Sequence, residues 1–327
     1  MYGSPHTDAS SANIAKNVNQ THIKTNSERN DSTDIENTSE LKMYQGFRSD
    51  HWLICNNYRY VMERMLPVRI LATKLLEIPE LQPWWAKLCL GEYAFDDSPQ
   101  HKYYLKDVDP TPENINRTKE IIEEAADYIT LRFRSVDFHS LRGIYAQCKR
   151  MTSSNAMLGP PTFCHPSLRG KSEIPAIMIE VHKGYLDYFS RPSSEVCPKA
   201  FIRTAFHLAM SLTHELTHAI DFLRRDPLYL QLDLWHSLTD REPETGRSWE
   251  AAIFPFKMEG PLPPFKDINR NLLWAAAWNA SWEDASQWSN LPTAWAQLFF
   301  DTAFWNKVRQ EGWGMVNPRY AKVSSPI

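Results

Sequence analysis

One short motif constrains this chain more than any other feature: His214-Glu215-x-x-His218, within the segment SLTHELTHAID. Residues four apart on an α-helix lie on the same face, so both imidazoles can reach one metal ion. A glutamate directly after the first histidine can hold and deprotonate a water molecule on that ion. The motif therefore predicts a helix with a catalytic site for one Zn²⁺, with His214 and His218 as metal ligands and Glu215 as the catalytic residue.

The surrounding sequence predicts the long helix that this motif requires, over residues 198–225. Pro198 suits a first-turn position, and Pro227 supplies a stop. With about 100° of rotation per residue, apolar residues gather on one side, namely Phe201, Ala205, Leu208, Leu212, Leu216, Ala219 and Leu223. The opposite stripe is polar and contains His207, Ser211, His214, His218, Asp221 and Arg225. The alternative interpretation is a solvated helix face that carries its histidines by chance.

Charge and composition argue against several classes of partner. The net charge is −3 and the pI is about 6.4, so we expect no nucleic-acid partner and no anionic membrane surface. No run approaches the roughly 18 apolar residues of a membrane span, and the N-terminal residues lack the apolar core of a secretory signal. The expected location is therefore intracellular and cytoplasmic. The 5 cysteines include no C-x-x-C pair, so a cysteine zinc site is not predicted.

Composition also divides the chain into parts. Residues 1–42 are rich in Ser, Thr and Asn and nearly free of apolar residues, so we expect a disordered polar tail. Residues 43–327 are expected to form a single α+β domain that is predominantly α. Its predicted parts are a helical N-terminal part (43–135), a sheet with the active-site helix (136–260), and a helical, Trp-rich C-terminal part (261–327).

Local patterns predict the helices of the N-terminal part. Dense apolar segments over 51–65 and 68–76 are expected to be helical, and aromatic stripes at this spacing are typical of core. A further helix begins at Thr111-Pro112, where a capping hydroxyl precedes a proline, and is expected to continue to Ile129. Its charged side is expected to be solvated.

Helices are also expected near the C-terminus. Trp274, Trp278 and Trp282 recur every four residues, which predicts one side of a helix, and a further helix is expected over 292–309. Eight of the twelve tryptophans lie from Trp249 onward. We expect them to be part of the hydrophobic core, and the alternative is that they line a pocket.

Two strands are expected before the active-site helix. The pattern is strand-like over 138–149, and alternation over 176–182 predicts a strand along the edge of the cleft, where an extended substrate can pair. His165 and His182 are candidates to line that cleft, although ordinary structural roles are the simpler interpretation.

A catalytic zinc ion normally has three protein ligands, so a third must be found. The metzincin continuation is absent, because Asp221 and Arg224 occupy the places of its glycine and third histidine. Over residues 175–255 the chain resembles the gluzincins, in which a glutamate on a later helix completes the site. The resemblance implies a zincin-like fold with Glu250 as third ligand, on a short helix capped by Ser248.

Other third ligands remain open, namely His236 and the loop residues Glu242 and Glu244. Thermolysin-type gluzincins have an aspartate four residues after the ligand glutamate, whereas this chain has Phe254 there, which indicates a divergent family. Asp221 either orients a ligand imidazole or has a surface or capping role.

The resemblance implies a zinc-dependent hydrolase, a metallopeptidase whose substrate is a peptide or protein. Arg247 and Tyr320 are among the candidates to stabilise the oxyanion, and the sequence selects neither. One alternative is a zinc enzyme that acts on a small molecule. Another is a non-catalytic zincin fold, in which a fourth protein ligand such as His207 or His236 closes the site.

Overall fold

A computed structural model describes residues 43–53, 58–97, 101–134, 146–150, 177–225, 232, 234–240, 242–259, 274–276 and 289–316. Predictions for the tail 1–42, for residues 138–145 of the strand expected over 138–149, and for His165, Trp278, Trp282 and Tyr320 lie outside these residues. Residues Met43–Ile327 form one compact unit. Its fold is mixed α+β and mainly helical, which confirms the α+β, predominantly α part of the prediction.

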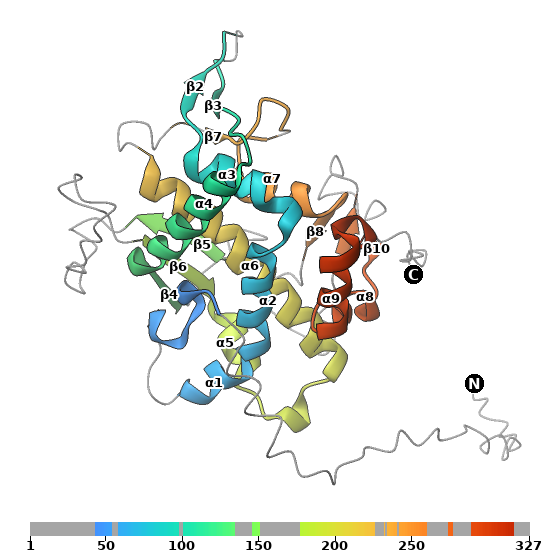
Figure 1. The fold of residues 1–327 in the computed structure, drawn as a ribbon. Coiled ribbons are helices and arrows are strands. Elements are labelled where there is room, and N and C mark those ends of the chain that lie inside the picture. The colour runs from blue at the N-terminus through green and yellow to red at the C-terminus, as the bar shows by residue number, and fades with distance from the viewer. Residues whose placement is uncertain are drawn as a thin grey trace, which may run out of the picture. The chain divides into compact units, whose positions relative to one another are not determined.

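The longest helix of the described residues is α6, Pro198–Arg224, and other helices pack around it (Figure 1). Those before it are α1 (Arg59–Arg64), α2 (Leu66–Leu76), α3 (Gln82–Leu90), α4 (Pro112–Ala125) and α5 (Lys183–Phe189). Those after it are α7 (Thr245–Ile253), α8 (Thr293–Leu298) and α9 (Thr302–Glu311).

The main sheet has the strand order β1-β4-β6-β5. Its strands are β1 (Trp52–Leu53), β4 (Ile129–Arg134), β6 (Ile177–His182) and β5 (Ala146–Arg150). Strand β4 runs parallel to both β1 and β6, and β5 pairs antiparallel with β6 at the edge. Alternate residues of each strand face opposite sides, so Ile179 and Val181 lie on one face and Glu180 on the other.

Two smaller sheets complete the described strands. One joins β2 (Tyr93–Phe95), β3 (Tyr103–Leu105) and β7 (Leu234–Trp235). The other joins β10 (Ser289–Asn290), β9 (Trp274–Ala276) and β8 (Lys257–Glu259).

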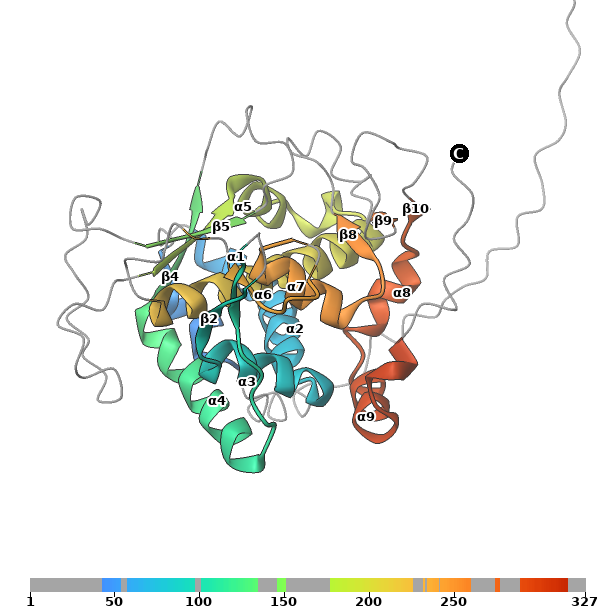
Figure 2. The same cartoon turned by 90° about the horizontal axis from the view of Figure 1, so that it is seen from above.

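The central helix α6 forms where the sequence predicts it, with Pro198 in its first turn. From Ala200 to Arg225 no residue is exposed, because α2, α3, α7, α8 and the strands β5 and β6 cover the helix on different sides. Viewed from above, α6 and α7 lie side by side in the middle of the unit (Figure 2). The histidine-bearing stripe is therefore not a solvated surface, and α6 is a buried helix with polar residues at its centre.

The N-terminal part is less helical than predicted. Trp52 and Leu53 form strand β1, where a helix is expected, and among the described residues of 51–65 the helix is α1, Arg59–Arg64. The helix predicted from Pro112 has the expected Thr111 cap, whose hydroxyl accepts the Asn114 N–H at 3.2 Å, but it ends at Ala125. Ile129 instead starts β4, because pairing with β6 supplies backbone partners that helix periodicity does not reveal.

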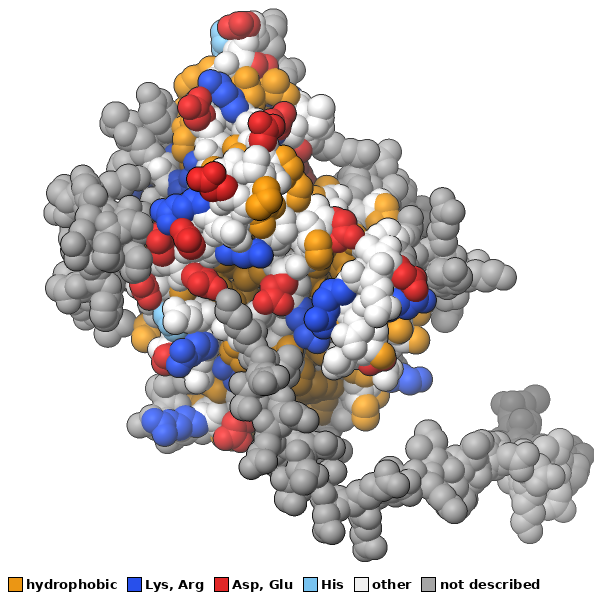
Figure 3. Space-filling model, in the orientation of Figure 1, with side chains coloured by type: hydrophobic (Ala, Val, Ile, Leu, Met, Phe, Trp, Pro, Cys, Tyr) orange, Lys and Arg blue, Asp and Glu red, His pale blue; other side chains and the backbone are white. Residues whose placement is uncertain are grey.

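The predicted solvated side of α4 is confirmed in part. Lys119, Glu120 and Glu123 are exposed and Ile122 is buried, but Glu124, on the same predicted side, is only half-buried and pairs with Arg117. Figure 3 shows acidic and basic side chains interspersed over this face of the molecule. In the described part of the chain, no helix is both long and apolar enough to cross a bilayer.

The C-terminal part also departs from the prediction. Trp274–Ala276 form strand β9, so the helix expected from the tryptophan spacing is wrong at this point. The helix expected over 292–309 is divided into α8 and α9, and Asp301 begins the second by accepting the Ala303 N–H at 2.8 Å. Core roles are confirmed for the buried tryptophans, which are Trp249, Trp295, Trp305 and Trp313.

Candidate metal centre

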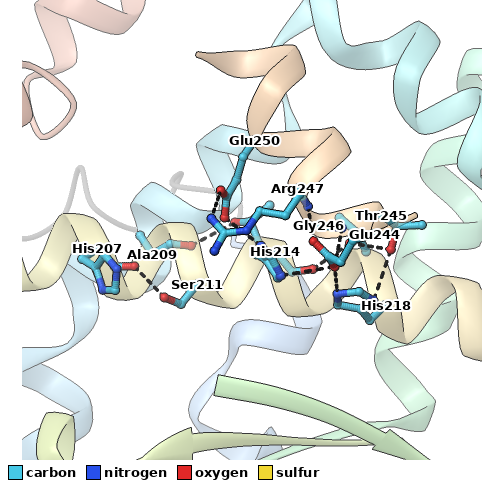
Figure 4. A network of polar contacts seen from close by, with 12 residues as sticks. His207, Ala209, Ser211, His214, His218, Glu244, Thr245, Gly246, Arg247 and Glu250 are labelled. Atoms are coloured by element: carbon cyan, nitrogen blue, oxygen red, sulfur yellow. Dashed lines mark hydrogen bonds and ion pairs between the residues drawn. The ribbon is translucent and has the colours of Figure 1, made fainter. Parts of the chain in front are cut away.

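The two histidines of the motif lie next to each other on α6. Their ring centroids are 5.3 Å apart, and the side chains of His214 and His218 are only 17% and 23% exposed. Helix geometry alone produces this pairing, because positions four apart are stacked along one face. Figure 4 shows both rings pointing towards the start of α7.

Glu244 meets both rings from the opposite side. Its Oε1 atom contacts His218 Nε2 directly and lies 3.5 Å from His214 Nε2. Within the described residues, His214, His218 and Glu244 are the group whose ligand atoms all lie within 4.8 Å and could hold a metal ion. Zinc ligands at about 2.1 Å in a tetrahedron are about 3.4 Å apart, so a small separation of Glu244 from His218 would admit the ion.

Glu250, the third ligand predicted from the sequence, lies on the other side of the His214 ring. Its Oε1 atom accepts a hydrogen bond from His214 Nδ1 at 2.7 Å, and its Oε2 accepts one from Arg247 at 2.7 Å (Figure 4). An acceptor at Nδ1 holds a proton on that nitrogen, so Nε2, which faces Glu244, is the ring nitrogen that a metal ion could use. Glu250 therefore bonds to the ring nitrogen away from the group that could hold a metal ion, and Glu244, not Glu250, belongs to that group.

The cap of α7 explains why Glu244 is placed there. The predicted cap, Ser248, lies inside the helix, and α7 instead begins at Thr245 with Glu244 as its N-cap. The Glu244 carboxylate accepts the backbone N–H groups of Gly246, at 3.1 Å, and of Arg247. These bonds satisfy donors that a helix leaves free at its start, and they fix the carboxylate beside the histidines.

The second ring nitrogen of His218 also has a partner. Thr245 Oγ1 lies 3.2 Å from His218 Nδ1, and the hydroxyls of Thr245 and Thr217 are 3.3 Å apart. Asp221, proposed from the sequence as an orienting or surface residue, is buried and bonds elsewhere. It accepts hydrogen bonds from Tyr93, at 3.2 Å, and from Arg225.

Glu215 lines the cleft and is buried, with only 7% of its surface exposed. Burial raises its pKa, and the positive charge of the two histidines and a backbone hydrogen bond from Cys148 lower it. The net direction is upward. A carboxylate with a raised pKa beside a metal-binding pair suits a group that must accept and return a proton.

Charge at the centre favours a divalent cation. Three carboxylates, Glu215, Glu244 and Glu250, surround the histidines, and Arg247 supplies one positive charge. With neutral imidazoles the four groups carry an excess of two negative charges. Burial by itself would lower the pKa of His214, but Glu244 and Glu250 raise it to about 10. The same field that favours a protonated imidazole would favour a metal cation at this place.

The cleft above the centre has a volume of about 460 Å³. Strand β5 lines one side of it through Ala146, Gln147 and Cys148. The sequence placed the strand over 176–182 at the cleft edge, but that strand is β6, which lies inside the sheet between β4 and β5. Local alternation predicts that these residues form a strand, but it does not predict where that strand lies in the sheet, because strand order depends on pairing between distant residues.

The remaining histidine candidates have structural partners. His236 stacks on Trp84 with centroids 4.3 Å apart, and its Nε2 lies 3.1 Å from the Trp84 carbonyl oxygen. His207 lies in the cleft, where its Nδ1 is 2.5 Å from the Tyr185 hydroxyl. His182 Nδ1 accepts the Gly184 N–H at 2.9 Å and so caps α5. None of the three belongs to the group that could hold a metal.

Sequence reasoning missed Gly246. A Cβ atom at this position would collide with the His214 ring, next to Nε2. The backbone of α7 can therefore approach the His214 ring only because this residue has no side chain. A glycine in the first turn of a helix is the signal that marks such a close approach.

Comparison with known proteins adds no relative: no protein-family model, no curated protein and no solved structure matches this chain.

Proposed function

We propose that this chain is a zinc-dependent hydrolase of the zincin type that cleaves peptide bonds. His214, His218 and Glu244 would hold one Zn²⁺, and Glu215 would be the catalytic base. The observation that carries the proposal is the convergence of both Nε2 atoms on Glu244 Oε1, with Glu215 buried beside them.

The donor set fits zinc, because two imidazoles and one carboxylate are a common catalytic ligand set that leaves a fourth position for water. When bound, Zn²⁺ would lower the pKa of that water towards about 7 and polarise a substrate carbonyl. Glu250 holds the proton of His214 on Nδ1, and Thr245 is the corresponding partner of His218.

Glu215 would move the protons. Its carboxylate would accept the proton of the attacking water and return it to the nitrogen of the leaving amine. The hydrogen bond from the Cys148 backbone holds this carboxylate against β5. Arg247 lines the same cleft, and its bond to Glu250 restricts its position, so it remains a candidate for binding the carbonyl oxygen.

The position of β5 favours a peptide as substrate. Among the described strands only β6 pairs with β5, and β5 itself lines the cleft. An extended peptide can add to such an edge by backbone hydrogen bonds, which would place its carbonyl groups over the centre.

The test is metal content and peptide turnover of the wild type beside Glu215→Gln. We expect near-stoichiometric zinc in both proteins and cleavage of a mixed peptide library by the wild type only. Removing a catalytic base typically lowers the rate about 10²- to 10⁴-fold. Zinc lost with Glu215→Gln, or turnover retained by it, would contradict the role of this residue. Folded wild type that binds no zinc would refute the proposal.

A further inference from the structure

The outer face of the main sheet carries a cluster of charges next to the cleft. Glu180, on β6, accepts hydrogen bonds from Arg132 at 2.9 Å, Arg134 at 2.6 Å, Gln147 at 2.8 Å and Lys149 at 2.9 Å. These five residues are called the Glu180 cluster below. Strand register explains the grouping, because Arg132 on β4 and Gln147 on β5 are the direct neighbours of Glu180.

The cluster has more positive than negative charge. Burial would raise the pKa of Glu180, but hydrogen bonds from its four partners lower it to about 2, so the carboxylate is ionised at neutral pH. The single negative charge of Glu180 is thus paired with three positive side chains. Glu180 is 1% exposed, whereas the side chains of Arg132, Arg134 and Lys149 are 38%, 40% and 43% exposed. The cluster therefore presents a net charge of about +2.

Strand β5 connects the cluster with the cleft. Gln147 lines the cleft and also hydrogen-bonds to Glu180, and Lys149 follows two residues later on the same face of the strand. A peptide paired with β5 on the side opposite β6 would alternate its side chains between the two faces. Those on the outer face would lie about 5 Å from Gln147 or Lys149, measured between Cβ atoms.

We infer that this cleft selects peptides with Asp or Glu at the position that lies beside Lys149. The inference rests on the proposed peptidase function for the place of the substrate. A substrate carboxylate at that position would approach Lys149 and would be attracted by the excess positive charge of Arg132 and Arg134. A lysine there would be repelled, so the cluster sorts substrates by charge at a position away from the scissile bond.

Binding is measured separately from cleavage, on zinc-loaded Glu215→Gln. Fluorescence anisotropy compares labelled peptides in which one position at a time is Glu, Gln or Lys. At one position of the scan we expect Glu to bind about fivefold more tightly than Gln, the upper range for a partly exposed ion pair. At about 1 M salt the preference should disappear, because the screening length falls to about 3 Å.

Variants of Lys149 identify the cluster as the cause. Lys149→Gln in the same background should abolish the preference, and Lys149→Glu should reverse it in favour of the Lys peptide. Glu180 keeps its other three partners in both variants, so the sheet should stay folded, which thermal unfolding can check. Lys183→Gln is the matched control, because Lys183 is 47% exposed but pairs with Asp187 outside the cluster.

The outcomes separate the two proposals. Equal binding and equal cleavage of Glu, Gln and Lys peptides would overturn the charge preference and leave the peptidase function standing. A Lys149-dependent Glu preference without cleavage of any peptide by the wild type would support the cluster and refute the peptidase function. An oligonucleotide of equal charge that binds more tightly than the Glu peptide would overturn the inference, since the cluster would then suit nucleic acid.

Discussion

Replacing Gly246 by alanine is the sharpest test of the proposed centre, because two physical effects there have opposite signs. Within a helix, alanine is favoured over glycine by about 1 kcal/mol. The structure predicts the reverse, because the new Cβ would collide with the His214 ring beside Nε2. Local propensity therefore predicts a stabilised protein, and the packing of α7 on α6 predicts a damaged metal centre.

The magnitude follows from how little the ring can move. His214 is 17% exposed, and Glu250 holds its Nδ1 atom at 2.7 Å, so a displaced ring must give up that hydrogen bond. Overpacking a tight site costs about 1–3 kcal/mol. After the gain from propensity, we expect a net loss of about 0–2 kcal/mol in the metal-free protein. For zinc we expect a loss of affinity of about 10- to 100-fold, as for loss of a group that orients a ligand.

The assay is zinc affinity by competition with a chelating dye, together with thermal unfolding with and without EDTA. Gly314→Ala is the matched control, because no atom lies within 4 Å of a Cβ built at Gly314. This control should bind zinc like the wild type and melt at the same temperature or slightly higher. If Gly246→Ala also binds zinc like the wild type and melts at a higher temperature, the prediction that α7 lies too close to His214 for a side chain at residue 246 is refuted.

The other predictions concern the third ligand and two buried histidines. Glu250→Gln should lower zinc affinity about 10- to 100-fold, as expected for loss of a residue that orients a ligand. Glu244→Gln should lower the affinity further. Calorimetric zinc titration compares the two variants, and the opposite order would indicate Glu250 as the ligand. Burial lowers the pKa of His236 to about 3, well below the value of about 6.5 in the unfolded chain. The contribution of the buried neutral ring to folding stability is then fully present above pH 6.5. As the pH falls towards 3, the free energy of unfolding decreases by about 1.4 kcal/mol per pH unit. In metal-free protein, urea unfolding between pH 6 and 4 should show a smaller loss for His236→Gln than for the wild type, and equal slopes would mean that His236 is not buried as a neutral ring. His207, whose pKa burial also lowers to about 3, should show the same effect on replacement by Gln.

Features that depend on a few consecutive residues could be predicted from the sequence. The course of α6, the cap at Thr111 and the strand over Ile177–His182 all follow from proline, capping and periodicity signals. The pairing of His214 with His218 belongs to the same class, because a helix places positions four apart together without help from the rest of the chain.

The third ligand could not be predicted in the same way. Glu244 and Glu250 are six residues apart, and both reach His214, one at each ring nitrogen. Ser248 is the better cap by residue type, yet α7 starts at Thr245, where its N-terminus packs against α6. The choice between the two glutamates depends on that start.

Strand order and the C-terminal tryptophans show the same division. Alternation identified β6 as a strand, but only pairing across the sheet places β5 at the edge that lines the cleft. Trp274 follows a helical spacing in the sequence and still forms a strand, because β8 and β10 supply its backbone partners. The α6 helix and the His214–His218 pair follow from residues close together in the chain, because a helix brings positions four apart to one face. The position of Glu244 beside the histidines, the strand at the cleft edge and the Glu180 cluster depend on contacts between residues far apart in the chain, which local patterns do not reveal.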